Sequence, residues 1–215
     1  MIYLAYISIL IRIIPVVLQW ISFSKKNQGA KFLFLFTLIS FLSDAISVIF
    51  SHIKTNTDFM FNLYQISEVV IVTFLAIEVG NFKHKLKTTI LTACALQVVF
   101  FVSICLLLNL ESSQDYISSV SKLYILIILF LAATHFIQNA ESNRKIETTP
   151  LMGLLGIFIY EALSFIPLIT MQLQRLSNHP KQVINIYLIL MISGNVIRDA
   201  LVTYHAIVQI KKTSE

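Results

Sequence analysis

Charged residues, glycine and proline are all scarce in this sequence. Aspartate, glutamate, lysine and arginine together make up 13% of the 215 residues, whereas 57% are hydrophobic. That charged share is about half of the usual one, and the mean hydropathy is +0.81. These values exclude an ordinary soluble domain, which needs a polar surface. With five glycines and four prolines, the sequence also shows no linker or low-complexity tract, and we expect one domain over residues 1–215.

The two cysteines, Cys94 and Cys105, both lie in one apolar run. On a helix they are separated by about 16 Å along the axis, which is too far for a disulfide within that helix. No CxxC pair is present, so the sequence predicts neither a disulfide scaffold nor a cysteine-based metal site, and we expect no cofactor. The net charge of +5 comes from basic residues scattered over short segments, which argues against a nucleic-acid partner.

What the sequence has in abundance is long apolar runs. A helix needs about 20 mostly apolar residues to cross the hydrocarbon of a bilayer. The runs predict an all-α fold of seven transmembrane helices, with short loops that make sequence neighbours antiparallel. The first run has no basic segment before it and no cleavage site after it, so we expect a retained span. The predicted spans are about Ile2–Ser22, Phe32–Ser51, Phe61–Gly80, Thr89–Asn109, Ile117–Gln138, Leu151–Gln172 and Gln182–Ile210.

The basic residues between the spans are distributed unevenly. If the N-terminus lies outside, the inner loops and tail hold ten lysines and arginines, and the outer loops hold three. Because basic loops stay on the cytoplasmic side, we predict an inner-membrane protein with N-terminus outside, C-terminus inside and the acidic segment Glu111–Asp115 in an outer loop. The inner residues are Lys25, Lys26, Lys31, Lys83, Lys85, Lys87, Arg144, Lys145, Lys211 and Lys212, and the outer ones are Lys54, Arg175 and Lys181.

Seven ionisable residues lie well inside the predicted spans. A charge at the bilayer centre costs at least ~2.5–3.5 kcal/mol, so such residues normally face the interior of a bundle. Three cations against four carboxylates are close to neutral, as a low-dielectric interior requires. We expect one polar interior, lined mainly by the first, second, third, sixth and seventh spans. Its cations are Arg12, Lys122 and Arg198, and its carboxylates are Asp44, Glu68, Glu161 and Asp199.

Depth along the spans suggests where a ligand would bind. Asp44, Glu68 and Lys122 fall in the outer part of their spans, and Arg12 and Glu161 lie near the midplane beneath them. The second and third spans are sequence neighbours, so Asp44 and Glu68 are predicted to face each other. We expect this outer cluster to bind a small polar or charged ligand.

The last span combines apolar length with an unusual density of polar residues. Asn195, Arg198 and His205 recur at helical spacing, which predicts a polar face that lines the interior over nearly three turns. Arg198 and Asp199 are adjacent and point about 100° apart, so we expect each to find a partner on a different helix. Gly194 is expected to let neighbouring helices approach closely.

No catalytic constellation stands out. The last span has no lysine before Lys211, which excludes a retinal Schiff base, and no aspartate lies in a Gly-x-Gly-Asp context. No motif marks a serine nucleophile. A zinc-dependent membrane hydrolase remains a third alternative, because four possible ligands fall at similar inner depth. These are His135, His205, Asp199 and Glu78.

Two short passages carry a resemblance. Ile192-Ser193-Gly194-Asn195 in the last span, and the segment from Tyr64 to Glu68, resemble a group of small standalone seven-helix membrane proteins of Bacteroidetes-type bacteria. Their layout is similar to the membrane regions that precede sensor histidine kinases. The resemblance implies an inner-membrane location, a sensory or regulatory setting and a signalling partner protein, and it supplies no catalytic residues.

Two functions follow from these observations. The first is a receptor-like or accessory protein in the lipid bilayer, with a polar cavity that binds a small polar ligand. The alternative is a small-molecule or proton-coupled transporter, because the charges extend from the outer to the inner third of the spans. A seven-helix sugar transporter built from two repeats matches this topology. Its expected proline recurs only as Pro15 in the first span and is missing from the fifth.

Overall fold

A computed structural model describes most of the chain. The backbone is described for residues 2–21, 28–53, 58–107, 110–142, 149–174 and 180–214. The side chains are described for residues 9–21, 28–50, 61–107, 117–139, 151–166 and 189–211.

Within these ranges the fold is all-α. The described residues form seven helices, one for each predicted apolar run, which confirms that these runs are helical. The helices are α1 (Ile2–Ile21), α2 (Gln28–Ile53), α3 (Asp58–Gly80), α4 (His84–Leu107), α5 (Leu110–Ser142), α6 (Thr149–Gln174) and α7 (Pro180–Ser214).

Most helices extend beyond the spans predicted from the sequence. The clearest difference is at α5, which begins at Leu110, so the prediction that Glu111–Asp115 forms a loop is wrong. Hydropathy marks where a helix leaves the hydrocarbon, whereas the helix itself continues as long as backbone hydrogen bonds form. The predicted span ends at Ser22 and Asn109 lie outside the described residues.

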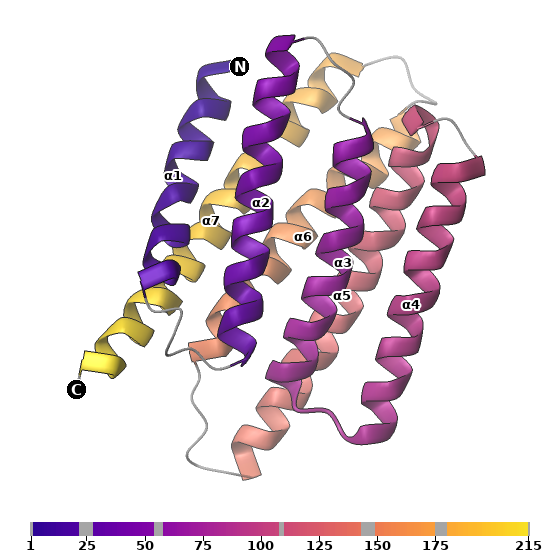
Figure 1. The fold of residues 1–215 in the computed structure, drawn as a ribbon. Helices are drawn as coiled ribbons and strands as arrows, with labels where there is room; N and C mark the ends of the chain where they lie inside the picture. The colour runs from indigo at the N-terminus through magenta and orange to yellow at the C-terminus, as the bar shows by residue number, and fades with distance from the viewer. Residues whose placement is uncertain are drawn as a thin grey trace.

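The helices stand roughly side by side in two rows (Figure 1). One row contains α1, α2, α3 and α4, and α7, α6 and α5 lie behind it. The most extensive packing is between α6 and α7 and between α3 and α5, while α1 joins α2 to α7. By contrast, α4 is peripheral and packs mainly against α3 and α5. The first and last helices are therefore neighbours, which brings residues near the two ends of the chain together.

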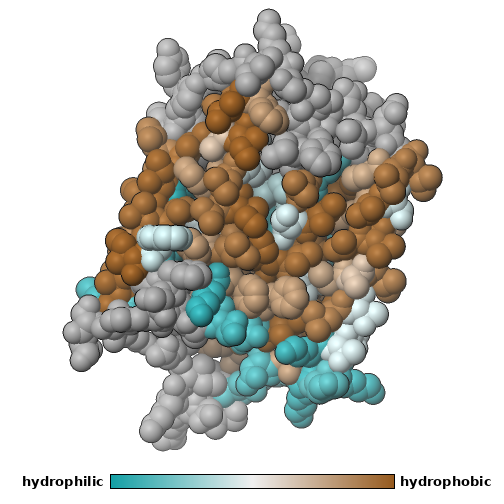
Figure 2. Space-filling model, viewed as in Figure 1, coloured by the Kyte–Doolittle hydropathy of each residue, from teal (hydrophilic) through white to brown (hydrophobic). Residues whose placement is uncertain are grey.

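The surface is apolar over a broad belt (Figure 2). Among the described residues, four helical segments are long and apolar enough to cross a membrane, and Ile9–Ile21 and Leu151–Ile166 are shorter apolar helices. Leu106 and Leu107 are more than 80% exposed, which only hydrocarbon tolerates over so large an area. This is a helical membrane protein. The four segments are Gln28–Phe50, Phe61–Gly80, His84–Leu107 and Ile117–Asn139.

A glycine on α6 allows this helix to pack closely against α7. Gly156 on α6 faces the backbone of α7, where an added Cβ would lie 3.3 Å from the carbonyl oxygen of Arg198. This small residue therefore allows α6 to contact α7 at the turn that carries Arg198.

At the end of α3, Asn81 adopts φ 46° and its N–H donates to the carbonyl of Ile77 at 3.1 Å. Asparagine tolerates this left-handed conformation, and the resulting tight turn places the start of α4 beside the end of α3.

Candidate functional site

A first group of buried polar side chains, the arginine cluster, consists of Arg12, Ser40, Asp44, Arg198 and Asp199. Arg12 on α1 is 2% exposed. Its Nη1 donates to Ser40 Oγ at 3.3 Å and to the Asp44 carboxylate of α2, and its Nε lies 3.4 Å from Asp199 Oδ2 on α7. One guanidinium group thus joins α1 to its sequence neighbour α2 and to the last helix, α7.

Arg198 completes the arginine cluster from α7. Its Nε and Nη2 donate to Asp199 Oδ1 at 3.0 and 2.9 Å, and its Nη1 donates to Ser40 Oγ at 3.3 Å. Arg198 thus has the expected partner on a different helix, Ser40 of α2. It also pairs directly with Asp199, which was not expected, because the long arginine side chain reaches around the helix despite the difference in direction. Asp199 also has the predicted partner on a different helix, which is Arg12.

A second group, the lysine cluster, consists of Tyr64, Glu68, Lys122, Tyr160 and Glu161. Lys122 Nζ on α5 donates to Glu161 Oε2 on α6 at 3.0 Å, and both side chains are almost fully buried. Tyr64 Oη donates to Glu68 Oε1 on the same face of α3. Glu68 interacts electrostatically with both Glu161 and Lys122, so two carboxyl groups surround one ammonium.

The two clusters are connected by Tyr160 on α6. Its ring centroid lies 4.5 Å from Arg198 Cζ and 5.2 Å from Lys122 Nζ, so it contacts a cation of each cluster. Desolvated cation–π contacts of this kind contribute up to about 2 kcal/mol. All seven ionisable residues predicted from the sequence therefore belong to one connected interior, although Asp44 remains 41% exposed.

The partition into two clusters differs from the sequence prediction. Asp44 pairs with Arg12, whereas Glu68 belongs to the group around Lys122, so the expectation that the two carboxylates face each other is wrong. Helix α5 contributes Lys122 to the interior, as predicted for this residue, although its span was not among those expected to form the main lining. Sequence neighbours pack together here, but the rotation of each helix decides which residues meet.

Three participants were missed by the sequence analysis. Ser40 precedes Asp44 by four residues and Tyr64 precedes Glu68 by four, so each lies on the same helical face as a predicted site residue. Tyr160 directly precedes Glu161. The spacing of four residues could have indicated Ser40 and Tyr64. Nothing in the sequence distinguishes Tyr160 from the other aromatic residues of the spans.

The predicted polar face of α7 is buried as expected. Arg198, Val202 and His205 are each at most 2% exposed, and Asn195 is half-buried. Within the described ranges, Asn195 Oδ1 accepts no hydrogen bond. Gly194 lies against Tyr160 and Leu163 of α6, where an added Cβ would come within 3.4 Å of both residues, which is consistent with its expected packing role.

The alternative metal-binding set does not come together. Among the described side chains, no group of three or more His, Cys, Asp or Glu residues could hold a metal ion. His135 contacts the ring of Phe82 edge-on, Asp199 is engaged by arginines, and Glu78 is exposed. Cys94 and Cys105 are free thiols. The described side chains bring together paired charges and aromatic rings.

Comparisons with protein-family models, with curated proteins and with solved structures found no match. The resemblance to seven-helix proteins of Bacteroidetes-type bacteria thus remains a prediction.

Proposed function

We propose that this protein is a receptor-like or regulatory membrane protein in which a small polar ligand rearranges the arginine cluster. One observation carries the proposal. Arg12 is almost fully buried, but its partner Asp44 is 41% exposed, so a ligand that reaches Asp44 has access to a network that is otherwise closed. A carboxylate in this position attracts an ammonium or another hydrogen-bond donor, and we propose a small amine as the ligand class.

The arrangement of partners provides a mechanism for signalling. When an amine binds the Asp44 carboxylate, Arg12 loses this partner and pairs with Asp199 alone. The Oδ2 atom of Asp199 already lies 3.4 Å from Arg12 Nε. The Asp199 carboxylate then accepts hydrogen bonds from both Arg12 and Arg198. Arg198 also donates a hydrogen bond to Ser40. The result is a shift of α7 relative to α1 and α2. A ligand that prefers one of two such arrangements shifts their populations by its difference in affinity.

The direction of signalling follows from the distribution of charge. In Figure 2 the hydrophilic surface gathers at the end of the molecule where α2 and α4 begin. The exposed basic residues described at the start of these helices and at the end of α7 are Lys31, Lys83, Lys85, Lys87 and Lys211. Under the positive-inside rule this end faces the cytoplasm, which supports seven spans with the N-terminus outside. A partner protein that contacts the end of α7 would receive the signal.

A thermal-shift screen tests the receptor proposal. The detergent-solubilised protein is heated with a panel of small amines, carboxylates and sugars. A ligand present at 100 times its Kd stabilises the folded state by about 2.7 kcal/mol, which raises the Tm by several degrees. We expect an amine to do so for the unmodified protein and for the control Glu78→Gln, but not for Asp44→Asn. An equal shift in Asp44→Asn would refute the assigned site.

A proton-coupled transporter is the second candidate, and the lysine cluster supports it. Glu68 and Glu161 interact around a single lysine. Among the described residues, Glu68 Oε2 and Glu161 Oε1 have no hydrogen-bond partner. Adjacent carboxyl groups in a membrane interior form a pair that takes up and releases protons together. Solute-dependent proton movement in proteoliposomes, lost in Glu68→Gln, would favour this function over the receptor.

A further inference from the structure

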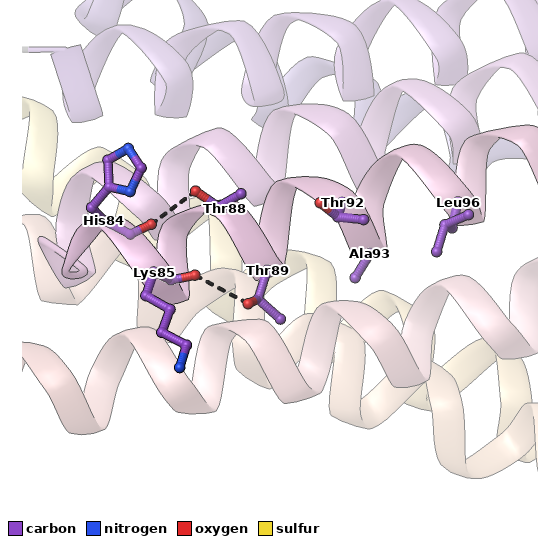
Figure 3. Close-up of a pocket in the computed structure, with 7 residues that line it drawn as sticks. All are labelled: His84, Lys85, Thr88, Thr89, Thr92, Ala93 and Leu96. Carbon is purple, nitrogen blue, oxygen red and sulfur yellow. Dashed lines mark hydrogen bonds between the residues drawn. The ribbon is translucent and has the colours of Figure 1, made fainter.

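Two adjoining hollows surround the beginning of α4, away from both buried clusters. The smaller one has a volume of about 340 Å³ and is lined by Lys83, Lys85, Leu86, Thr89 and His135. The larger one has a volume of about 600 Å³ and runs along α4 from His84 to Leu96 (Figure 3). Lys85 and Thr89 line both hollows, so the two form one continuous surface feature.

The smaller hollow is built for an anion. Lys83 and Lys85 contribute two ammonium groups, and none of the residues that line the hollow is acidic. His135 enters from α5, and its ring is held edge-on against Phe82 at a centroid distance of 5.0 Å. In the described part of the chain, its buried Nδ1 has no hydrogen-bond partner. The start of α4, where helical N–H groups point outward, adds further positive potential.

The larger hollow changes from polar to apolar along the helix. The hydroxyls of Thr88 and Thr89 each donate to a backbone carbonyl one turn earlier at 3.0 Å (Figure 3), so they need no external partner. Beyond them the lining continues through Thr92 and Ala93 to Leu96. His84 and Leu96 are about 18 Å apart along the helix, which is close to the ~15 Å of hydrocarbon in one leaflet. The hollow thus has the length of one lipid leaflet, with its cationic end at the headgroup level.

These features point to a lipid and not to a soluble anion or a protein. The apolar face of α4 continues beyond the hollow, where Leu96 and Val99 are each more than 60% exposed, so an occupant of the apolar part must tolerate hydrocarbon around it. The basic residues at the other end attract anionic headgroups. A ligand with a phosphate at one end and an acyl chain at the other complements both parts.

We propose that the start of α4 and the adjacent part of α5 bind one anionic phospholipid. Its phosphate is held by Lys83, Lys85 and His135, and one acyl chain lies along Ala93 and Leu96. Because α4 packs mainly against only two helices, a lipid phosphate that bridges Lys85 on α4 and His135 on α5 also ties this peripheral helix to the bundle. Anionic lipid should therefore both bind with preference and stabilise the protein.

Native mass spectrometry of the whole protein in detergent tests the proposal. The protein is titrated with dioleoyl-phosphatidylglycerol, with dioleoyl-phosphatidylcholine and with inorganic phosphate. Each lysine near an anionic headgroup contributes a factor of about five in affinity, so Lys83→Gln/Lys85→Gln should lower phosphatidylglycerol binding by about 25-fold. The matched control is Lys31→Gln/Lys211→Gln, which removes the same charge from exposed lysines that do not line either hollow. We expect it to bind nearly as well as the unmodified protein.

A third variant separates the two parts of the site. Ala93→Phe fills the exposed apolar part and should weaken phosphatidylglycerol binding at least fivefold without changing the Tm in lipid-free detergent. Equal affinity for the two lipids would refute the proposal, and equal losses in the two lysine variants would show diffuse attraction only. Competition by inorganic phosphate as strong as that by phosphatidylglycerol would show an anion site without a lipid.

Discussion

Replacing Lys122 by methionine tests whether the buried charges stabilise one another. The side chain is 5% exposed, and its Nζ lies 3.0 Å from Glu161 Oε2, which is fully buried. Methionine fills a similar volume but removes the ammonium, so Glu161 and Glu68 are left without the cation they surround. Breaking a buried pair in this way costs about 3–5 kcal/mol, and the lost contact with Tyr160 adds up to about 2 kcal/mol. We expect Lys122→Met to be among the most destabilising single substitutions.

The companion variant is Lys122→Met/Glu161→Gln. It removes both charges of the pair, so that the loss of Lys122 no longer leaves a buried, uncompensated charge on Glu161. The double variant should therefore recover part of the stability lost in Lys122→Met, because Glu161 no longer carries an uncompensated charge while Glu68 still lacks its cation. Both are measured by equilibrium unfolding in mixed micelles, with Lys87→Met as the control, because Lys87 is exposed. A loss below about 1 kcal/mol in Lys122→Met would refute the reasoning, as would a double variant less stable than the single one.

The remaining predictions use the same preparation. Asp199→Asn should cost at least about 3 kcal/mol in micellar unfolding, because two buried arginines lose a shared carboxylate; a loss as small as that of an exposed substitution would contradict this. Gly156→Ala should destabilise by about 1–3 kcal/mol, since its Cβ would lie 3.2 Å from a side chain of α7. Gly194→Ala should lower the free energy of unfolding by less, because its Cβ would meet its nearest atoms at 3.4 Å. A larger loss of stability in Gly194→Ala than in Gly156→Ala would argue against this packing. In a variant without the native cysteines, Lys87→Cys in whole cells should react with an impermeant maleimide only after permeabilisation; labelling of intact cells would reverse the proposed orientation.

The burial of the ionised groups was predictable because it follows from the solvent. A charge in hydrocarbon is costly wherever it lies along the chain, so residues such as Arg12, Glu68 and Glu161 had to turn inward in almost any seven-helix bundle. The same argument located the helices, since long apolar runs are stable in a bilayer only when their backbone groups are hydrogen-bonded internally. Both conclusions depend on composition and length alone.

The partners of those charges were not predictable in the same way. Which residues meet depends on the rotation of each helix and on where two helices cross, and a rotation of one residue changes the direction of a side chain by about 100°. Lys122 of α5 pairs with Glu161 of α6, and Asp44 pairs with Arg12 instead of facing Glu68. The direct pairing of Arg198 with Asp199 depends on the reach of one flexible side chain.

The amino-acid sequence by itself determined that this protein is a helical membrane protein with charges inside, because the free energy of transfer into hydrocarbon is a property of each segment. Only the tertiary structure decided that these charges form two clusters joined through Tyr160, and that Lys83, Lys85 and His135 line one hollow at the start of α4. These features arise between side chains of different helices. Contacts of that kind depend on packing geometry, which no single segment encodes.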